Sequence, residues 1–277
     1  VYNDEISKIY SGNNQRRLPL SLEDLKMINK DEALNEFKKK FDDFNGYNLL
    51  IVGSFDEKEL PTLLEKYFAS LPNSEKVISP KPLDLKIPKN IVKKEVVKGV
   101  DKKSTVTLIF PYNGAYGEKE RILYNGFSRV LNIALIEDIR EKIGGVYSIS
   151  SKVSLSPNNF GEDKMIISFS CDTKRTEELK NAVLKTVSDM LNKDIDQKQI
   201  DSIIKNYELS YKNELKENIF WLNYFYQKST VNPKYKVPTP EEYAKIMQKK
   251  DLMESAKKAI NLNNYIDVTL VPEKESL

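Results

Sequence analysis

The sequence predicts an α+β fold in which an antiparallel or mixed sheet carries its helices on one face. Two observations predict it: short segments of alternating polar and apolar residues come in pairs, and longer segments with helical spacing lie between and after these pairs. Strands joined as hairpins, with helices segregated from them, form one sheet under a helical layer. The opposite face of the sheet is then expected to be free for a ligand or a partner.

The alternating segments predict strands near residues 91–98, 104–110, 146–155, 163–171 and 265–271. Apolar residues three and four positions apart predict a helix that ends near Lys142, helices near 174–192 and 197–217, and further helices up to about residue 260. Cys171 ends the alternating segment that starts at Met165, which predicts a small buried residue and not a reactive thiol. Together these elements form one complete predicted domain over residues 91–277.

A weak internal repeat extends the pattern to residues 1–90. A shift of 218 positions aligns "SLEDLKMI" from Ser21 with "TPEEYAKI" from Thr239, and each segment predicts a capped helix with acidic residues in its first turn. Further along, "ALNEFKKKFDDFNGYNLLIVG" aligns with "DLMESAKKAINLNNYIDVTLV", and each predicts a helix, a turn with asparagine and a strand. Residues 1–90 are therefore predicted to comprise the C-terminal tail of a preceding α+β domain and a proline-containing linker over 73–90.

The composition excludes several classes of protein and of site. The chain has no histidine and one cysteine, which excludes the usual catalytic zinc site, a triad with a histidine base and an internal disulfide. Its 44 basic and 41 acidic residues give a net charge of +3, too balanced for a nucleic-acid-binding protein. No apolar run approaches the roughly 20 residues that span a bilayer. Carboxylate-only catalysis is not excluded, although no acidic cluster supports it.

The stretch "EDIREKIGGVYSIS", residues 137–150, holds the candidate site. The apolar stripe of the preceding helix continues to Ile143, which places Arg140 in the last helical turn beside that stripe. The Gly144–Gly145 pair permits positive φ and a sharp reversal, after which Tyr147 opens a strand. Arg140 and Tyr147 then lie on the two sides of the reversal, where both can reach one ligand.

Both residues also have ordinary structural interpretations. Arg140 precedes Glu141 in a helical turn, so it can be a solvated partner of nearby acids and of the helix dipole. Tyr147 shares the apolar parity of Ile149, which is compatible with a core ring whose hydroxyl lies at the sheet edge. The aromatic residues around Trp221 are interpreted as mostly core residues, because they point in all directions from one helix.

Four segments, in the same order, resemble the pitrilysin/insulinase-type zinc peptidases, the inverzincins, and in particular their long bacterial members. The segments are "NLLIVGSFDEKELPTLLEKYFASLP", "KSTVTLIFPYNG", "LIEDIREKIGGVYSI" and "KENIFWLNYF". The third looks like the arginine-to-tyrosine motif of these enzymes. The similarity extends over nearly the whole chain, from about Leu18 to Val271.

The resemblance implies a four-domain peptidase whose two halves close around an unfolded peptide. The first half of such enzymes carries H-x-x-E-H and a distal glutamate, which bind zinc. This chain looks like the C-terminal part of the second half, with no metal site or catalytic residue of its own. Arg140 and Tyr147 are then expected to contact the substrate main chain near the scissile carbonyl. The expected partners are a peptide or unfolded polypeptide and the zinc-bearing N-terminal half, and a periplasmic or secreted location follows from the bacterial members alone.

The chain by itself is expected to bind no catalytic zinc and to hydrolyse nothing. Its first residues form neither a signal peptide nor an initiator methionine, which predicts a start inside a longer gene product. Two alternatives stay open: a non-catalytic scaffold or complex subunit of the same fold, and a separately encoded partner of a zinc-bearing subunit. An H-x-x-E-H motif encoded upstream favours the peptidase, and its absence favours the scaffold.

Overall fold

The computed structural model describes residues 1–74, 81–114, 117–156, 162–193 and 195–273. They form two compact units. Unit 1 comprises Val1–Leu18, Leu83–Lys212 and Pro238–Leu277, and unit 2 comprises Pro19–Pro82 and Asn213–Val237. Unit 1 contains the sheet and nearly all of the buried apolar residues. This division does not test the domain boundary near residue 90, which stays a prediction.

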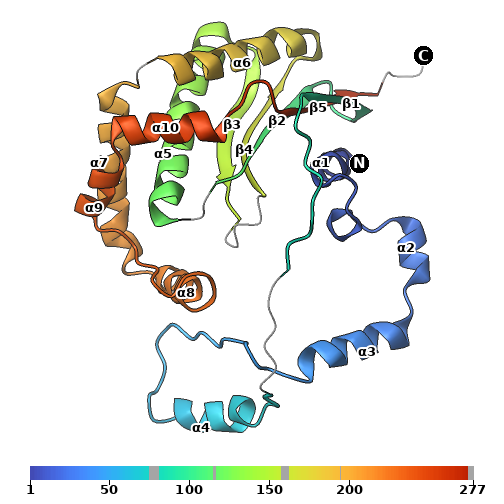
Figure 1. Cartoon of the computed structure of the whole chain (residues 1–277), viewed down its shortest axis with the longest axis vertical. Coiled ribbons are helices and arrows are strands. Elements are labelled where there is room, and N and C mark those ends of the chain that lie inside the picture. The colour runs from blue at the N-terminus through green and yellow to red at the C-terminus, as the bar shows by residue number, and fades with distance from the viewer. Residues whose placement is uncertain (75–80, 115–116, 157–161, 194, 274–277) are drawn as a thin grey trace. The chain divides into compact units, whose positions relative to one another are not determined.

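Unit 1 is built on a five-stranded mixed sheet in the order β1-β5-β2-β4-β3 (Figure 1). Only β1 and β5 run parallel, and the other neighbouring strands are antiparallel. The strands are β1 (Val92–Gly99), β2 (Ser104–Tyr112), β3 (Val146–Ser154), β4 (Asp163–Cys171) and β5 (Ile266–Pro272). Each strand predicted between residues 91 and 277 is therefore present.

Helices cover one face of this sheet, which confirms the predicted fold class (Figure 1). The helices in contact with the sheet are α5 (Glu118–Leu135), α6 (Thr176–Asn192) and α10 (Lys249–Ala259). Two further helices, α7 (Gln197–Glu214) and α9 (Pro240–Ile246), contribute buried residues to the same core. The core between helices and sheet takes alternate residues of β4, including Cys171, which is fully buried as predicted. Burial raises the pKa of the Cys171 thiol, so this cysteine is an inert core residue.

The opposite face of the sheet is not free along its whole width. Helix α1 (Tyr2–Ser11) packs against it, because Tyr10 and its apolar neighbours form a second cluster with residues of β2 and β5. The Tyr2 hydroxyl lies 2.9 Å from both the Val268 carbonyl oxygen and the Thr107 hydroxyl. The expectation of a free face is thus wrong for β1, β5 and β2, since the apolar stripe of α1 must itself be buried.

Unit 2 contains α2 (Leu22–Met27), α3 (Lys30–Phe41), α4 (Leu60–Leu64) and α8 (Asn218–Tyr226). Short helical segments lie at Glu65–Ala69 and Gln227–Val231 in unit 2, and at Gln15–Arg17 and Thr173–Arg175 in unit 1. The caps of the repeat are present in both copies: Ser21 before α2 and Thr239 before α9 each form a capping box with the acid three residues later. Within the described residues, no helix has the length and apolar character that a membrane crossing requires.

The first copy of the repeat lacks its predicted strand. Residues 48–53 form no strand in the described structure, although the residues aligned with them form β5. β5 is hydrogen-bonded to β1 and β2 on its two edges, whereas no described strand pairs with residues 48–53. A lone strand leaves its backbone groups unpaired, so the sequence pattern alone does not produce one. Leu49 and Ile51 stay 50% and 44% exposed.

Two further predictions concern unit 2 and the linker. None of the aromatic residues of α8 is buried, and Trp221 is 37% exposed, so their interpretation as core residues is wrong. The physical reason is their place in unit 2, to which neither buried cluster of the described residues extends. Within the predicted linker, residues 75–80 lie outside the described residues, and Leu85 and Ile87 pack against the cluster beneath α1.

Candidate functional site

Arg140 lies in a π-helical segment, Ile136–Ile143, that continues α5 without a break. At its end the Gly144 amide donates to the Ile139 carbonyl oxygen at 2.9 Å, five residues back. The wider turn changes which residues face the core: Ile139 is fully buried, but Ile143 is 42% exposed. The apolar stripe therefore ends one turn earlier than predicted. Turns of this kind inside α-helices are frequent at functional sites.

The Arg140 side chain is accessible and weakly paired. It is 55% exposed, and its Nε lies 3.8 Å from Oε1 of Glu141. An exposed pair at this distance contributes little to stability. The nearby Asp138 carboxylate instead accepts from Lys142 at 2.7 Å. The guanidinium is thus available to a ligand, although the loose pair with Glu141 also fits a solvated helix end.

The reversal after the helix requires both glycines. Gly144 has φ 70° and ψ 176°, a region that is essentially restricted to glycine, and Gly145 has φ 91°. The Arg175 Nη1 donates to the Gly144 carbonyl oxygen at 3.2 Å, while Nε and Nη2 of the same guanidinium donate to Glu178 at 3.0 and 2.6 Å. Arg175 therefore holds the reversal, a role without a local sequence signal because it lies 31 residues further along the chain.

Substitution Gly144→Ala is expected to lower the free energy of unfolding of the chain by about 1–3 kcal/mol. A Cβ on Gly144 would meet no atom within 4 Å, so the effect would come from backbone strain alone. Urea denaturation followed by circular dichroism measures it. Lys142→Ala is the control: its pair with Asp138 is exposed, so the expected change is below about 0.5 kcal/mol. Equal stability of Gly144→Ala and the native chain would contradict the strained reversal.

Tyr147 is the extra residue of a β-bulge in the edge strand β3. Val146 lies opposite Cys171 and Ser148 opposite Ser170, which leaves Tyr147 without a partner on β4. The bulge breaks the alternation on which the core interpretation depended, and the Tyr147 side chain is 64% exposed. That interpretation is therefore wrong, and the ring lies at the surface beside the reversal.

Arg140 and Tyr147 thus present two exposed hydrogen-bond donors on the two sides of the Gly144–Gly145 reversal, in one unit of the protein. A guanidinium and a phenol can both donate to a carbonyl oxygen, and both bonds strengthen when that oxygen gains negative charge. The described contacts include no hydrogen bond or ion pair that joins the two side chains. The donors of each side chain are therefore not used by the other. What the arrangement can do chemically is bind and polarise a carbonyl group.

The chain's own residues do not fit a catalytic zinc ion. Among the described residues, no three histidine, cysteine, aspartate or glutamate side chains gather where they could hold a metal. The sequence contains no histidine, and its one cysteine is buried in the core. We therefore derive no metal-dependent step from this chain.

Comparison with known proteins gives a family match over residues 30–207, to the model described as the peptidase M16 inactive domain. A curated relative, the zinc protease PQQL-like of Arabidopsis thaliana, is 24% identical over 80% of this chain and 25% of its own length. Among solved structures, the ferredoxin protease FusC in complex with Arabidopsis ferredoxin has a TM-score of 0.76 at 14% identity, over 98% of this chain and 30% of its own. The periplasmic protease PqqL of Escherichia coli has a TM-score of 0.63 at 19% identity, over 79% of this chain and 24% of its own.

The chain spans about a quarter or less of the length of the curated relatives that it matches. The structural likenesses, all at low identity, establish the fold. The family match covers more than half of the chain and confirms the resemblance found in the sequence. The chain belongs to the family of the peptidase M16 inactive domain, the non-catalytic part of the inverzincin peptidases.

Proposed function

We propose that this chain is the substrate-binding, chamber-forming C-terminal part of a zinc metalloendopeptidase whose zinc is bound by an N-terminal half of the same protein. The observation that carries the proposal is the exposed pair Arg140 and Tyr147, in a chain of this family, on the two sides of a reversal that only glycine permits. The substrate is a peptide or unfolded polypeptide. A periplasmic location is part of the proposal, since PqqL of E. coli is described as periplasmic.

The chemistry of peptide hydrolysis suits these two side chains. Attack on the scissile carbonyl develops negative charge on its oxygen, and donors held in place before the reaction stabilise that charge without reorganisation. Arg140 supplies a permanent cation with a planar fork of N–H groups, and Tyr147 supplies one O–H. The chain's part in the reaction is to bind and orient the substrate and to polarise its carbonyl group.

The test is made on the intact protein that contains this chain. Metal analysis is expected to find one zinc ion per protein, and an unfolded peptide is expected to be cleaved. The 277-residue chain alone is expected to show neither. An intact protein without zinc and without turnover would overturn the proposal and favour the non-catalytic scaffold. Turnover that appears only after a separate zinc-bearing subunit is added would place the catalytic half on another chain.

Substitution Tyr147→Phe in the intact peptidase is expected to lower kcat/KM by about tenfold, because one hydrogen bond to a developing charge is lost while the ring is kept. Thermal stability should not change, since the hydroxyl is at the surface. Steady-state kinetics and a melting curve measure the two effects. Tyr226→Phe, at another exposed tyrosine, is the matched control and should leave kcat/KM unchanged. A Tyr147→Phe enzyme with native kinetics would assign the ring a role in packing only.

A further inference from the structure

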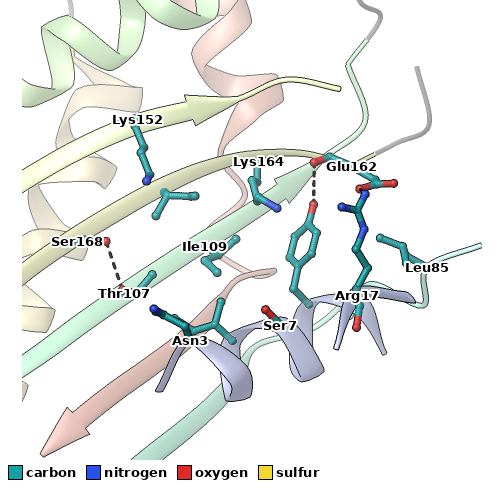
Figure 2. Close-up of a pocket in the computed structure, with 14 residues that line it drawn as sticks. Asn3, Ser7, Arg17, Leu85, Thr107, Ile109, Lys152, Glu162, Lys164 and Ser168 are labelled. Carbon is teal, nitrogen blue, oxygen red and sulfur yellow. Dashed lines mark hydrogen bonds and ion pairs between the residues drawn. The ribbon is translucent and has the colours of Figure 1, made fainter. Parts of the chain in front are cut away.

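A second polar site lies in unit 1, away from the reversal. It is a cavity of about 450 Å³ between α1 and the part of the sheet that α1 leaves uncovered (Figure 2). Figure 2 shows Asn3 and Ser7 on the helix side and Thr107, Ser168, Lys152 and Lys164 on the sheet side. The volume is in the range of pockets that hold small ligands or parts of peptides.

The cavity carries an excess of positive charge. Lys152 on β3 and Lys164 on β4 project from neighbouring strands into it, where Ile166 lies opposite Lys152. Arg17 also lines the cavity, but it forms an ion pair with Glu162, which is the one acidic residue among those that line it. The two lysines are therefore not neutralised, and the cavity has two net positive charges.

Neither lysine has an ion-pair partner among the described residues. The Lys164 ammonium lies 3.8 Å above the centre of the Tyr10 ring, a cation–π contact. Burial, together with the charges of Arg17 and Lys152, lowers the pKa of Lys164, and only Glu162 acts in the opposite direction. A half-buried ammonium beside a second lysine is an unfavourable arrangement that an anion would relieve.

Two other features of the cavity point to a ligand of mixed character. Ser11 is among the lining residues, and its buried hydroxyl has no hydrogen-bond partner in the described structure. Such a buried, unpaired group is uncommon in native proteins. The remaining wall is apolar and includes Ile6, Ile109 and Ile166. A carboxylate carried on an apolar chain satisfies both kinds of wall, whereas a free inorganic anion satisfies only the lysines.

We propose that this cavity binds an acidic segment of the polypeptide substrate, with a glutamate or aspartate carboxylate between Lys152 and Lys164. The choice of a polypeptide as the ligand rests on the proposed function, and the requirement for a carboxylate rests on the cavity itself. The site holds the substrate at a point separate from the Arg140–Tyr147 pair and selects substrates that contain an acidic segment.

The experiment measures binding of a fluorescein-labelled decapeptide of alternating glutamate and alanine to the 277-residue chain by fluorescence anisotropy. The same peptide with glutamine in place of glutamate is expected to bind at least about tenfold more weakly. Lys152→Met and Lys164→Met are each expected to lower the affinity for the glutamate peptide by about tenfold, the usual effect of losing one charge-assisted hydrogen bond. Lys257→Met removes an exposed lysine of α10 on the other side of the sheet and should have no effect.

A second measurement on the unaltered chain does not depend on the folding of the variants. Carbodiimide coupling of the bound glutamate peptide, mapped by mass spectrometry, is expected to join it to Lys152 or Lys164. Equal affinity for the glutamate and glutamine peptides, or coupling confined to other lysines, would overturn the proposal. Inorganic phosphate that displaces the peptide more strongly than sodium chloride of equal ionic strength would show a free-anion site instead. This binding is measured on the 277-residue chain, whereas zinc content and turnover are measured on the intact protein. An intact protein without zinc or turnover, together with peptide binding that depends on Lys152 and Lys164, would overturn the proposed function and support this site.

Discussion

Replacing Arg140 by alanine in the intact peptidase is expected to lower kcat/KM by roughly 10²-fold or more, or about 2.7 kcal/mol of transition-state stabilisation. Under the proposed function, the guanidinium donates to the carbonyl oxygen as that oxygen becomes negative. Its exposed position and its weak pair with Glu141 leave the donors available for this bond. Steady-state kinetics with an unfolded peptide measure the effect. The zinc content of the protein should not change, because the proposed function places the metal in the N-terminal half.

Two further variants separate a role in substrate binding from a role in folding. Arg140→Lys should recover little activity, since an ammonium is a point charge without the planar fork of the guanidinium. Arg129→Ala removes an exposed arginine of α5 and should leave the kinetics unchanged. If Arg140→Ala and Tyr147→Phe both fold normally and keep native kinetics, the substrate role proposed for the pair is wrong, and the stretch is only the end of one helix and the start of a strand.

Periodicity in the sequence predicted the sheet and its helical layer, because the strands and the helices bury their apolar residues in one core. Alternate residues of β4 are buried from Met165 to Cys171, as period-two spacing requires, and the helical stripe of α5 is buried from Phe127 to Leu135. The predicted strand at 48–53 has the same local pattern as β5 but failed to form, since a strand depends on hydrogen bonds from neighbours. Local pattern specifies which side chains can share a face, and pairing decides whether a strand exists.

The candidate site was found in the sequence, but its local geometry was not. The π-helical segment moves Ile143 out of the core, and the bulge at Tyr147 turns a side chain of apolar parity toward solvent. Each irregularity adds one residue to a regular repeat, which a periodicity argument cannot detect. Arg175 and the lysines of the cavity were also missed, because long-range contacts and a single surface charge leave no mark in the sequence.

The helical layer contains a buried ion pair whose disruption is expected to destabilise the fold strongly. Lys180 of α6 and Asp267 of β5 are 7% and 3% exposed, and the Lys180 Nζ lies 2.9 Å from Oδ2 of Asp267. The ammonium also pairs with the more exposed Glu177 at 2.5 Å. Asp267 is on a central strand, and its Oδ1 accepts from the Thr269 hydroxyl at 3.0 Å. The pair therefore links the helical layer to the middle of the sheet.

Lys180→Met is expected to lower the free energy of unfolding by about 3–5 kcal/mol, because it fills the same space but leaves the Asp267 carboxylate buried without a cation. Urea denaturation of the chain measures this loss. The double variant Lys180→Met/Asp267→Leu should recover most of it, since a buried pair adds little over apolar packing once both charges are removed. A double variant no more stable than Lys180→Met would show that packing, and not the unpaired charge, causes the loss.

The same pair has a pH signature with a defined sign. Burial alone would lower the pKa of Lys180, but its hydrogen bonds to Glu177 and Asp267 outweigh burial and raise that pKa above the usual 10.5. A raised pKa in the folded state means that the stabilisation is fully present below the unfolded pKa and is lost as the pH rises through the folded value. The difference in unfolding free energy between the native chain and Lys180→Met should therefore be constant near neutral pH and shrink above pH 10.5. A difference that grows in this alkaline range would contradict the assignment, because Asp267 would then be stabilised by something other than the Lys180 charge.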